Sequence, residues 1–155
     1  MFRTIVVGTD GSRSAYRAVQ GATQLARLCS ARLHLVTAYL PSADMAVVGP
    51  MGAGLAASEE HQVPADIVAM LESLDKEISA EGVDVTVHAI AARAADAILD
   101  VADQQQADAI VLGNRGVQGS RPYVGGVPLN VLQHAHCAVL VLPTTLPLGS
   151  DPPAP

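Results

Sequence analysis

The sequence predicts an α/β protein, a single doubly wound five-stranded parallel sheet in the strand order 3-2-1-4-5 with helices on both faces. Three observations support this prediction. Short apolar runs alternate along the chain with segments of helical periodicity. Half of the 155 residues are hydrophobic but only 3% are aromatic, a composition that suits parallel strands covered by helices. A glycine-rich loop follows the fourth apolar run, where open α/β sheets bind ligands.

The first β-α-β unit is predicted from the N-terminal forty residues. Residues 4–8 form a continuous β-branched run, which indicates a strand buried on both faces. A polar turn ends this strand, and Ser12 or Ser14 can cap the helix that follows. Apolar residues recur at helical spacing over residues 15–28, and residues 32–38 form the second predicted strand.

The periodicity disappears from about residue 40 to residue 64, where Gly and Pro are scattered among Ala and Met. A loop of this length is uncommon in a compact domain and is either functional or partly disordered. We predict a flexible segment, because nothing in this stretch constrains the backbone.

The second half of the chain continues the alternation of helix and strand. A helical stripe begins near Ala65, and Gly82 stops it. Residues 83–89 alternate between apolar and polar side chains, which indicates a less buried strand at an edge of the sheet. The remaining predicted elements are a helix over 95–102, a strand over 109–112, a short helix over 128–135 and a strand over 138–142.

The composition limits the classes of function. Residues 1–143 are predicted to form one domain, and the proline-rich tail 144–155 is predicted to be disordered. A net charge of −6 argues against binding to nucleic acid or to a membrane surface. Cys29 and Cys137 lie in apolar patterns and are predicted to be buried free thiols. Without a signal peptide or a membrane span, we expect a cytoplasmic protein.

Two loops are expected to face each other across one crevice. With right-handed crossovers, a switch point between the first and fourth strands brings the turn at Asp10 beside the loop that begins at Gly113. Glycines allow close approach of a ligand, and a helix N-terminus favours an anion. On the residues alone, however, Asp10 can equally be a turn or cap residue, and the glycines can be ordinary turn glycines.

The residues of both loops resemble one known family. The similarity lies in Ile5-Val6-Val7-Gly8-Thr9-Asp10-Gly11-Ser12, in Val111 to Gly116, in Gly125 to Pro128 and in Val131 to Val141. On these residues the chain resembles the universal stress protein family from Phe2 to Pro143. ATP-binding members of that family carry Gly, two residues, Gly, nine residues, Gly, then Ser or Thr. The amino-acid sequence of these motifs looks closest to that of actinobacterial members, some of which bind cyclic AMP.

The resemblance implies a set of nucleotide-binding residues. Asp10 would bind the ribose hydroxyls, with Thr9 and Gly11 shaping its turn. Ala38, at the end of the second strand, would offer its backbone to the adenine. The phosphate side of the implied site comprises Leu112, Gly113, Arg115, Gly116, Gly125, Gly126 and Val127.

Two departures from the family motif concern the phosphates. Gly126 stands where the family has Ser or Thr, and only eight residues, 117–124, separate the second and third glycines. If Gly126 is taken as the motif glycine, the spacing is restored but Val127 occupies the hydroxyl position. The adenosine half is therefore better supported than a triphosphate. The side chains able to compensate are Ser120, Arg115 and Arg121.

Three functions remain open at this point. The first is a non-catalytic stress-response or signalling module that binds ATP, AMP or cyclic AMP (cAMP), with Mg2+ accompanying ATP. The second is a ligand-free dimeric interaction protein of the same fold. The third and least favoured is a weak ATPase, because the sequence shows no general base and no metal carboxylate besides Asp10.

No catalytic residue and no metal ligand is assigned. The histidines at positions 34, 61, 88, 134 and 136 lack metal-binding spacing and are expected to be structural or exposed. A homodimer is expected, because the apolar strand 138–142 would leave an adhesive edge if it remained unpaired.

Overall fold

The computed structural model describes residues 1–40, 63–114 and 126–144. It shows one parallel sheet in the order β3-β2-β1-β4-β5, which confirms the predicted fold class and strand order. In chain order the elements are β1 (Thr4–Gly8), α1 (Arg13–Cys29), β2 (Arg32–Tyr39), α2 (Ala65–Ala80), β3 (Val85–Ala91), α3 (Ala94–Gln104), β4 (Ala109–Gly113), α4 (Val127–His134) and β5 (Ala138–Leu142). The segments predicted to be flexible (about 40–64) or disordered (144–155) fall almost entirely outside the described residues.

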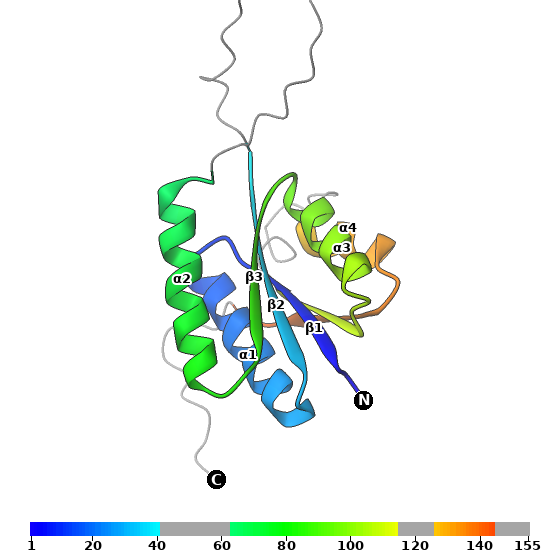
Figure 1. The fold of residues 1–155 in the computed structure, drawn as a ribbon. Coiled ribbons are helices and arrows are strands. Elements are labelled where there is room, and N and C mark those ends of the chain that lie inside the picture. The colour runs from blue at the N-terminus through cyan, green and yellow to red at the C-terminus, as the bar shows by residue number, and fades with distance from the viewer. Residues whose placement is uncertain (41–62, 115–125, 145–155) are drawn as a thin grey trace, which may run out of the picture.

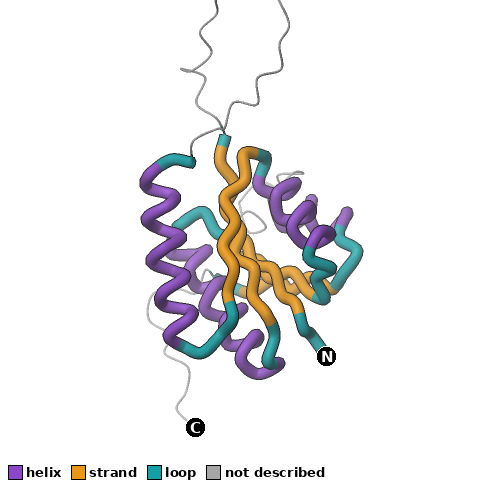
Figure 2. The backbone as a smooth tube through the Cα atoms, in the orientation of Figure 1, coloured by secondary structure: helices purple, strands orange, loops and turns teal. Residues whose placement is uncertain are grey.

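Helices cover both faces of the sheet. Figure 1 shows α1 and α2 on one side of the strands and α3 and α4 on the other, and Figure 2 shows the same layers as a tube. Successive residues of β1 point to opposite layers, so Ile5 and Val7 pack on the α1–α2 side and Val6 packs on the α3–α4 side. All three are fully buried, which explains why the run is apolar throughout and does not alternate.

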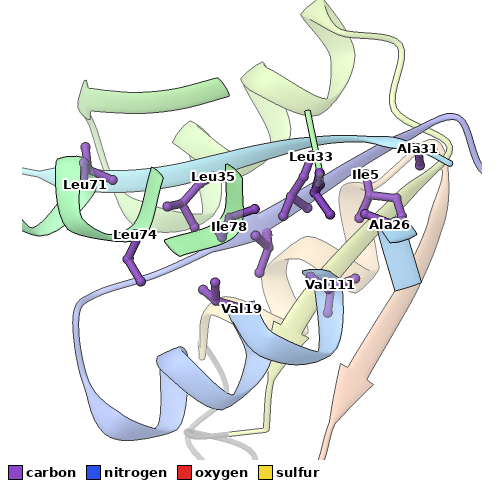
Figure 3. Packing of buried hydrophobic residues seen from close by; sticks show 13 residues of the cluster. Ile5, Val19, Ala26, Ala31, Leu33, Leu35, Leu71, Leu74, Ile78 and Val111 are labelled. Carbon is purple, nitrogen blue, oxygen red and sulfur yellow. The ribbon is translucent and has the colours of Figure 1, made fainter. Parts of the chain in front are cut away.

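The larger core lies between α1, α2 and the sheet (Figure 3). Val19 and Ala26 of α1 meet Leu33 and Leu35 of β2 there, while α2 contributes three buried residues. These are Leu71, Leu74 and Ile78, which belong to the predicted stripe. Their spacing places them on one face of the helix, and α2 packs into the core through that face.

The start of α1 settles one alternative that the sequence left open. Ser12 is the N-cap, and its hydroxyl accepts a hydrogen bond from the backbone N–H of Ala15 at 3.2 Å. Ser14 lies inside the helix and makes a different contact, described below. The cap satisfies one of the N–H groups that the first turn of a helix leaves without an intrahelical partner.

Two details of the sequence prediction were wrong. The third strand runs over Val85–Ala91 and not over 83–89, because its pairing with β2 begins at Leu33 opposite Val85 and extends to Tyr39 opposite Ala91. Its position at an edge of the sheet is confirmed. Cys29 and Cys137 are free thiols as expected, but both are only partly buried.

The strand order creates a switch point at β1. This strand pairs with β2 on one side and with β4 on the other, and the helices that follow β1 and β4 in the chain, α1 and α4, lie on opposite faces of the sheet. The carboxyl ends of β1 and β4 are therefore neighbours at the place where ligands bind in open α/β sheets. Among the described helices, none combines the length and the apolar character that a membrane crossing requires.

Candidate functional site

A cleft of about 430 Å³ lies at the carboxyl ends of β1 and β4. Six of the residues implied by the sequence line it, namely Thr9, Asp10, Ala38, Leu112, Gly113 and Val127. Gly11 and Gly126 are adjacent in the chain to lining residues. Arg115, Gly116 and Gly125, and the compensating candidates Ser120 and Arg121, lie outside the described residues. The fold thus brings together the turn after β1 and the end of β4, as the switch-point argument predicted.

Hydrogen bonds fix the turn after β1 to the neighbouring strand. The backbone N–H of Thr9 donates to the carbonyl of Val36 at 2.9 Å, and the hydroxyl of Thr37 donates to the carbonyl of Thr9 at 3.0 Å. Thr9 is buried, so these bonds are shielded from water. The position of Asp10, the next residue, is therefore set by β2 as well as by β1.

Two side chains of the turn also accept hydrogen bonds from the backbone of the turn itself. The hydroxyl of Thr9 accepts the N–H of Gly11 at 3.2 Å, and the Oδ1 of Asp10 accepts the N–H of Ser12 at 2.9 Å. This Asx-type contact is the turn role that the sequence left open for Asp10. The side chain of Asp10 also forms part of the cleft wall. The geometry is therefore compatible with a structural role and a binding role at once.

Helix α2 supports the turn from behind. Gly11 has a φ of +74°, and a Cβ built on it would lie 2.6 Å from the Sδ of Met70. A side chain at position 11 would thus be strained by its backbone angle and would also collide with Met70. Glycine at this position lets α2 pack directly against the turn that carries Asp10.

Three helices point their N-termini toward the cleft. Ser12, Ala94 and Val127 lie at or next to the starts of α1, α3 and α4, and all three line it. The N-cap residues of α3 and α4, Arg93 and Gly126, make no side-chain cap bond, so within the described residues the first-turn N–H groups are not occupied by N-cap side chains. Pro128 in the first turn of α4 lacks an N–H, which leaves that helix fewer donors. Convergent helix N-termini give the cleft a preference for an anionic group.

The cleft offers little acid–base chemistry. Among its described lining residues only Asp10 carries an acidic or basic side chain. Within the same described part of the chain, no group of three or more His, Cys, Asp or Glu side chains is arranged to hold a metal ion. What the described residues offer a ligand is one carboxylate, backbone donors and an apolar floor.

The sequence did not assign part of the lining. The additional residues are Gly8, Ser12, Ser14, Ala15, Val36, Ala94, Ile98 and Pro128. Val36 could have been found, because it shares a strand face with Ala38 two positions later. Ala94 and Ile98 lie four residues apart on one face of α3, but periodicity does not say which end of a helix borders a cleft.

Comparison with known proteins gives a consistent result. The family model of the universal stress protein family matches residues 1–143. Universal stress protein Rv1636 of Mycobacterium tuberculosis is 34% identical over 148 residues, which cover 93% of this chain and 98% of that protein.

Solved structures with the same fold include nucleotide complexes. A universal stress protein in complex with cAMP has 32% identity and a TM-score of 0.74, and the match covers 93% of this chain and 98% of that one. The universal stress protein of Archaeoglobus fulgidus in complex with dAMP has 25% identity and a TM-score of 0.62, with coverage of 90% and 96%.

Proposed function

The chain belongs to the universal stress protein family, and from this premise we propose that it binds an adenine nucleotide and acts as a non-catalytic stress-response module. One observation carries the proposal. The Asp10 turn and the end of β4 at Gly113 line the same cleft at the switch point of the sheet. The sequence resemblance assigns these two loops to opposite ends of a nucleotide.

In the proposed complex, each part of the nucleotide has a matching surface. The carboxylate of Asp10 accepts hydrogen bonds from the ribose hydroxyls, and Val36 and Ala38 of β2 lie beside the adenine. The phosphate lies toward the N-terminus of α4, where Val127 lines the cleft. The apolar floor from Ile98 and Leu112 complements the flat face of the base.

The candidate ligands are ATP, AMP and cAMP, with Mg2+ accompanying ATP. Two solved relatives are complexes with the monophosphates cAMP and dAMP, which supports a ligand with a single phosphate. The absence of a hydroxyl at Gly126 points the same way, because fewer donors face additional phosphates.

We propose that binding changes partner affinity and does not lead to turnover. The cleft residues that the structure describes include no second titratable side chain beside Asp10, which supports a binding role. A ligand shifts the population of protein molecules toward the conformation that it binds more tightly. The nucleotide concentration would therefore set the fraction of molecules in the conformation that a partner recognises. A cytoplasmic location is part of this proposal and is supported by the two free thiols, Cys29 and Cys137.

A titration of Asp10→Ala tests the proposal. We expect saturable heat with ATP, AMP or cAMP for the wild-type protein and a loss of about 10- to 100-fold in affinity for the variant. The reason is that hydrogen bonds to a charged group contribute about 1.5–3 kcal/mol. Asp100→Ala is the matched control, since Asp100 is an exposed carboxylate on α3 that is not among the cleft residues. Isothermal titration calorimetry gives the affinities.

The alternative is a ligand-free dimeric interaction protein. It is favoured by the missing hydroxyl at Gly126, and the absence of heat with all three nucleotides would make it the better account. A homodimer is part of both proposals. Its proposed interface is the free edge of β5, where Val139, Leu140, Val141 and Leu142 are only partly buried.

A further inference from the structure

We infer that Thr144 is a positioning residue for the nucleotide site, because it holds the end of β4 against α1 at the cleft wall. This inference rests on the proposed function. Thr144 follows β5 and is only 4% exposed, although it carries a hydroxyl. Its polar atoms contact Ser14, which lines the cleft, and Asn114, which follows the lining residue Gly113. They also contact Arg17, which lies on α1 and is not a cleft residue.

The contact with Asn114 is twofold. The Oδ1 of Asn114 accepts the backbone N–H of Thr144 at 2.9 Å and its hydroxyl at 3.0 Å. The backbone N–H of Asn114 in turn donates to the carbonyl of Leu142 at 2.9 Å. Asn114 directly follows β4 and is buried, so the departure of the chain from β4 is fixed to the end of β5.

The direction of the hydrogen bonds can be deduced. A carbonyl oxygen only accepts, so the single hydroxyl proton of Thr144 is used on Asn114. The hydroxyl of Ser14, which lies 2.5 Å from that of Thr144, must therefore be the donor in the bond between them. The result is a directed chain from Ser14 through Thr144 to Asn114, which joins α1 to the end of β4.

The directed chain has a consequence for the ligand. Ser14 lines the cleft, but its only hydroxyl proton is committed to Thr144. Toward a ligand, the hydroxyl can act only as an acceptor, so Ser14 does not replace the phosphate-binding hydroxyl that is missing at Gly126. Phosphate binding then depends on backbone groups on the phosphate side of the cleft, where the contacts of Asn114 with Thr144 and Leu142 fix the end of β4 at Gly113.

Thr144 also forms the rear of the cleft wall. A Cβ built on Gly113, which lines the cleft, would lie 3.1 Å from the Oγ1 of Thr144 and 3.2 Å from its Cγ2. The guanidinium of Arg17 on α1 donates to the carbonyl of Thr144 at 3.1 Å. Thr144 is thus held by α1 and leaves little room for a side chain at position 113.

Thr144→Val tests this role, because it removes the hydroxyl and keeps the shape. We expect the affinity for AMP to fall about tenfold and the affinity for adenosine to change less than about twofold, since the residue positions the phosphate side. Thr144→Ser, which retains the hydroxyl, should bind AMP as the wild type does. Calorimetric titrations with AMP and adenosine measure both affinities.

The matched control is Thr23→Val. Thr23 is equally buried on α1, and its hydroxyl donates to the carbonyl of Val19 at 2.9 Å, away from the cleft. This control should lose stability without losing the preference for AMP over adenosine. A parallel loss of AMP and adenosine binding in Thr144→Val would reduce Thr144 to a structural residue and overturn the inference.

A second pair of variants covers the case in which Thr144→Val does not fold. Arg17→Met removes the contact with the Thr144 carbonyl, and Arg13→Met removes the same charge from an exposed position on α1. We expect Arg17→Met to weaken AMP binding at least threefold more than Arg13→Met does. Equal effects would sink the inference, while failure of the wild type to bind ATP, AMP, cAMP and adenosine would sink the proposed function as well.

Discussion

At the scale of single residues, two glycines show how packing adds to backbone strain. Gly11 and Gly82 both have positive φ, +74° and +79°. A Cβ at Gly11 would collide with Met70, whereas a Cβ at Gly82 would meet nothing within 4 Å. Substitutions at these two positions therefore distinguish the free-energy cost of a positive φ from the cost of a steric clash.

We expect Gly82→Ala to destabilise the protein by about 1 kcal/mol, the usual cost of a left-handed conformation. Gly11→Ala should cost about 0.5–1.5 kcal/mol more, since the flexible side chain of Met70 must also change its rotamer. Urea denaturation measures both. Adding Met70→Ala to Gly11→Ala should recover part of the difference, and equal losses for the two single variants would show that Met70 does not hold the turn.

At the scale of elements, the edge strand β5 offers a position at which a charge can test dimerisation. β3 and β5 are the edge strands, and β3 is the longer of the two. Val139 of β5 packs against the α3–α4 core, whereas Val141 is assigned to neither core among the described residues. Val141 is therefore the position where a charge disturbs the edge of β5 with the least effect on folding.

If the homodimer forms through β5, Val141→Lys should give a monomer in sedimentation equilibrium, because an edge lysine opposes strand pairing. Val87→Lys is the control on the other edge, at a side chain that is 36% exposed, and it should leave the dimer intact. A Val141→Lys protein that is folded by circular dichroism and still dimeric would place the interface elsewhere.

At the scale of the whole molecule, a pair of histidines links stability to pH. The Nδ1 of His34 on β2 lies 3.0 Å from the Nε2 of His88 on β3. His34 is 4% exposed, and its Nε2 has no hydrogen-bond partner among the residues that the structure describes. The charged side chains acting on His34 are Arg32 and Asp84, and α3 covers this face of the sheet with apolar residues.

Burial lowers the pKa of both histidines below the ordinary value of 6.5, and the charge of His88 and then of Arg32 lowers the pKa of His34 further. The unfolded chain therefore binds protons at a higher pH than the folded protein does. The contribution of the pair to stability is complete above about pH 6.5 and is lost as the pH falls toward the folded pKa values.

We accordingly expect the free energy of unfolding to decrease between pH 7 and pH 5, as measured by urea denaturation. The pKa of the Asp108 carboxyl is lowered from 3.8 by the backbone N–H groups of Arg3 and Thr4, so its own contribution changes only at lower pH. His88→Gln should flatten the pH dependence, whereas His134→Gln, at an exposed position on α4, should not. An unchanged slope in His88→Gln would contradict this account.

The sequence by itself determined the fold class, the strand order and the meeting of Asp10 with Gly113. It could do so because runs such as residues 4–8 report burial through local periodicity, and right-handed crossovers leave few ways to order five parallel strands. The family resemblance added the expected ligand class. The nucleotide-binding roles of all the assigned residues remain predictions, and Arg115, Gly116 and Gly125 lie outside the described part of the chain.

Only the tertiary structure decided which distant side chains meet. Ser14 and Thr144 are 130 residues apart, and His34 and His88 are 54 apart. No local pattern encodes either contact, because each depends on the register of neighbouring strands and on how a helix packs against them. The same reason explains the third strand, whose bounds were set by its pairing with β2 and not by its own alternation. The periodicity of apolar residues shows which face of an element is buried. Which residues pack against that face depends on how the strands and helices assemble.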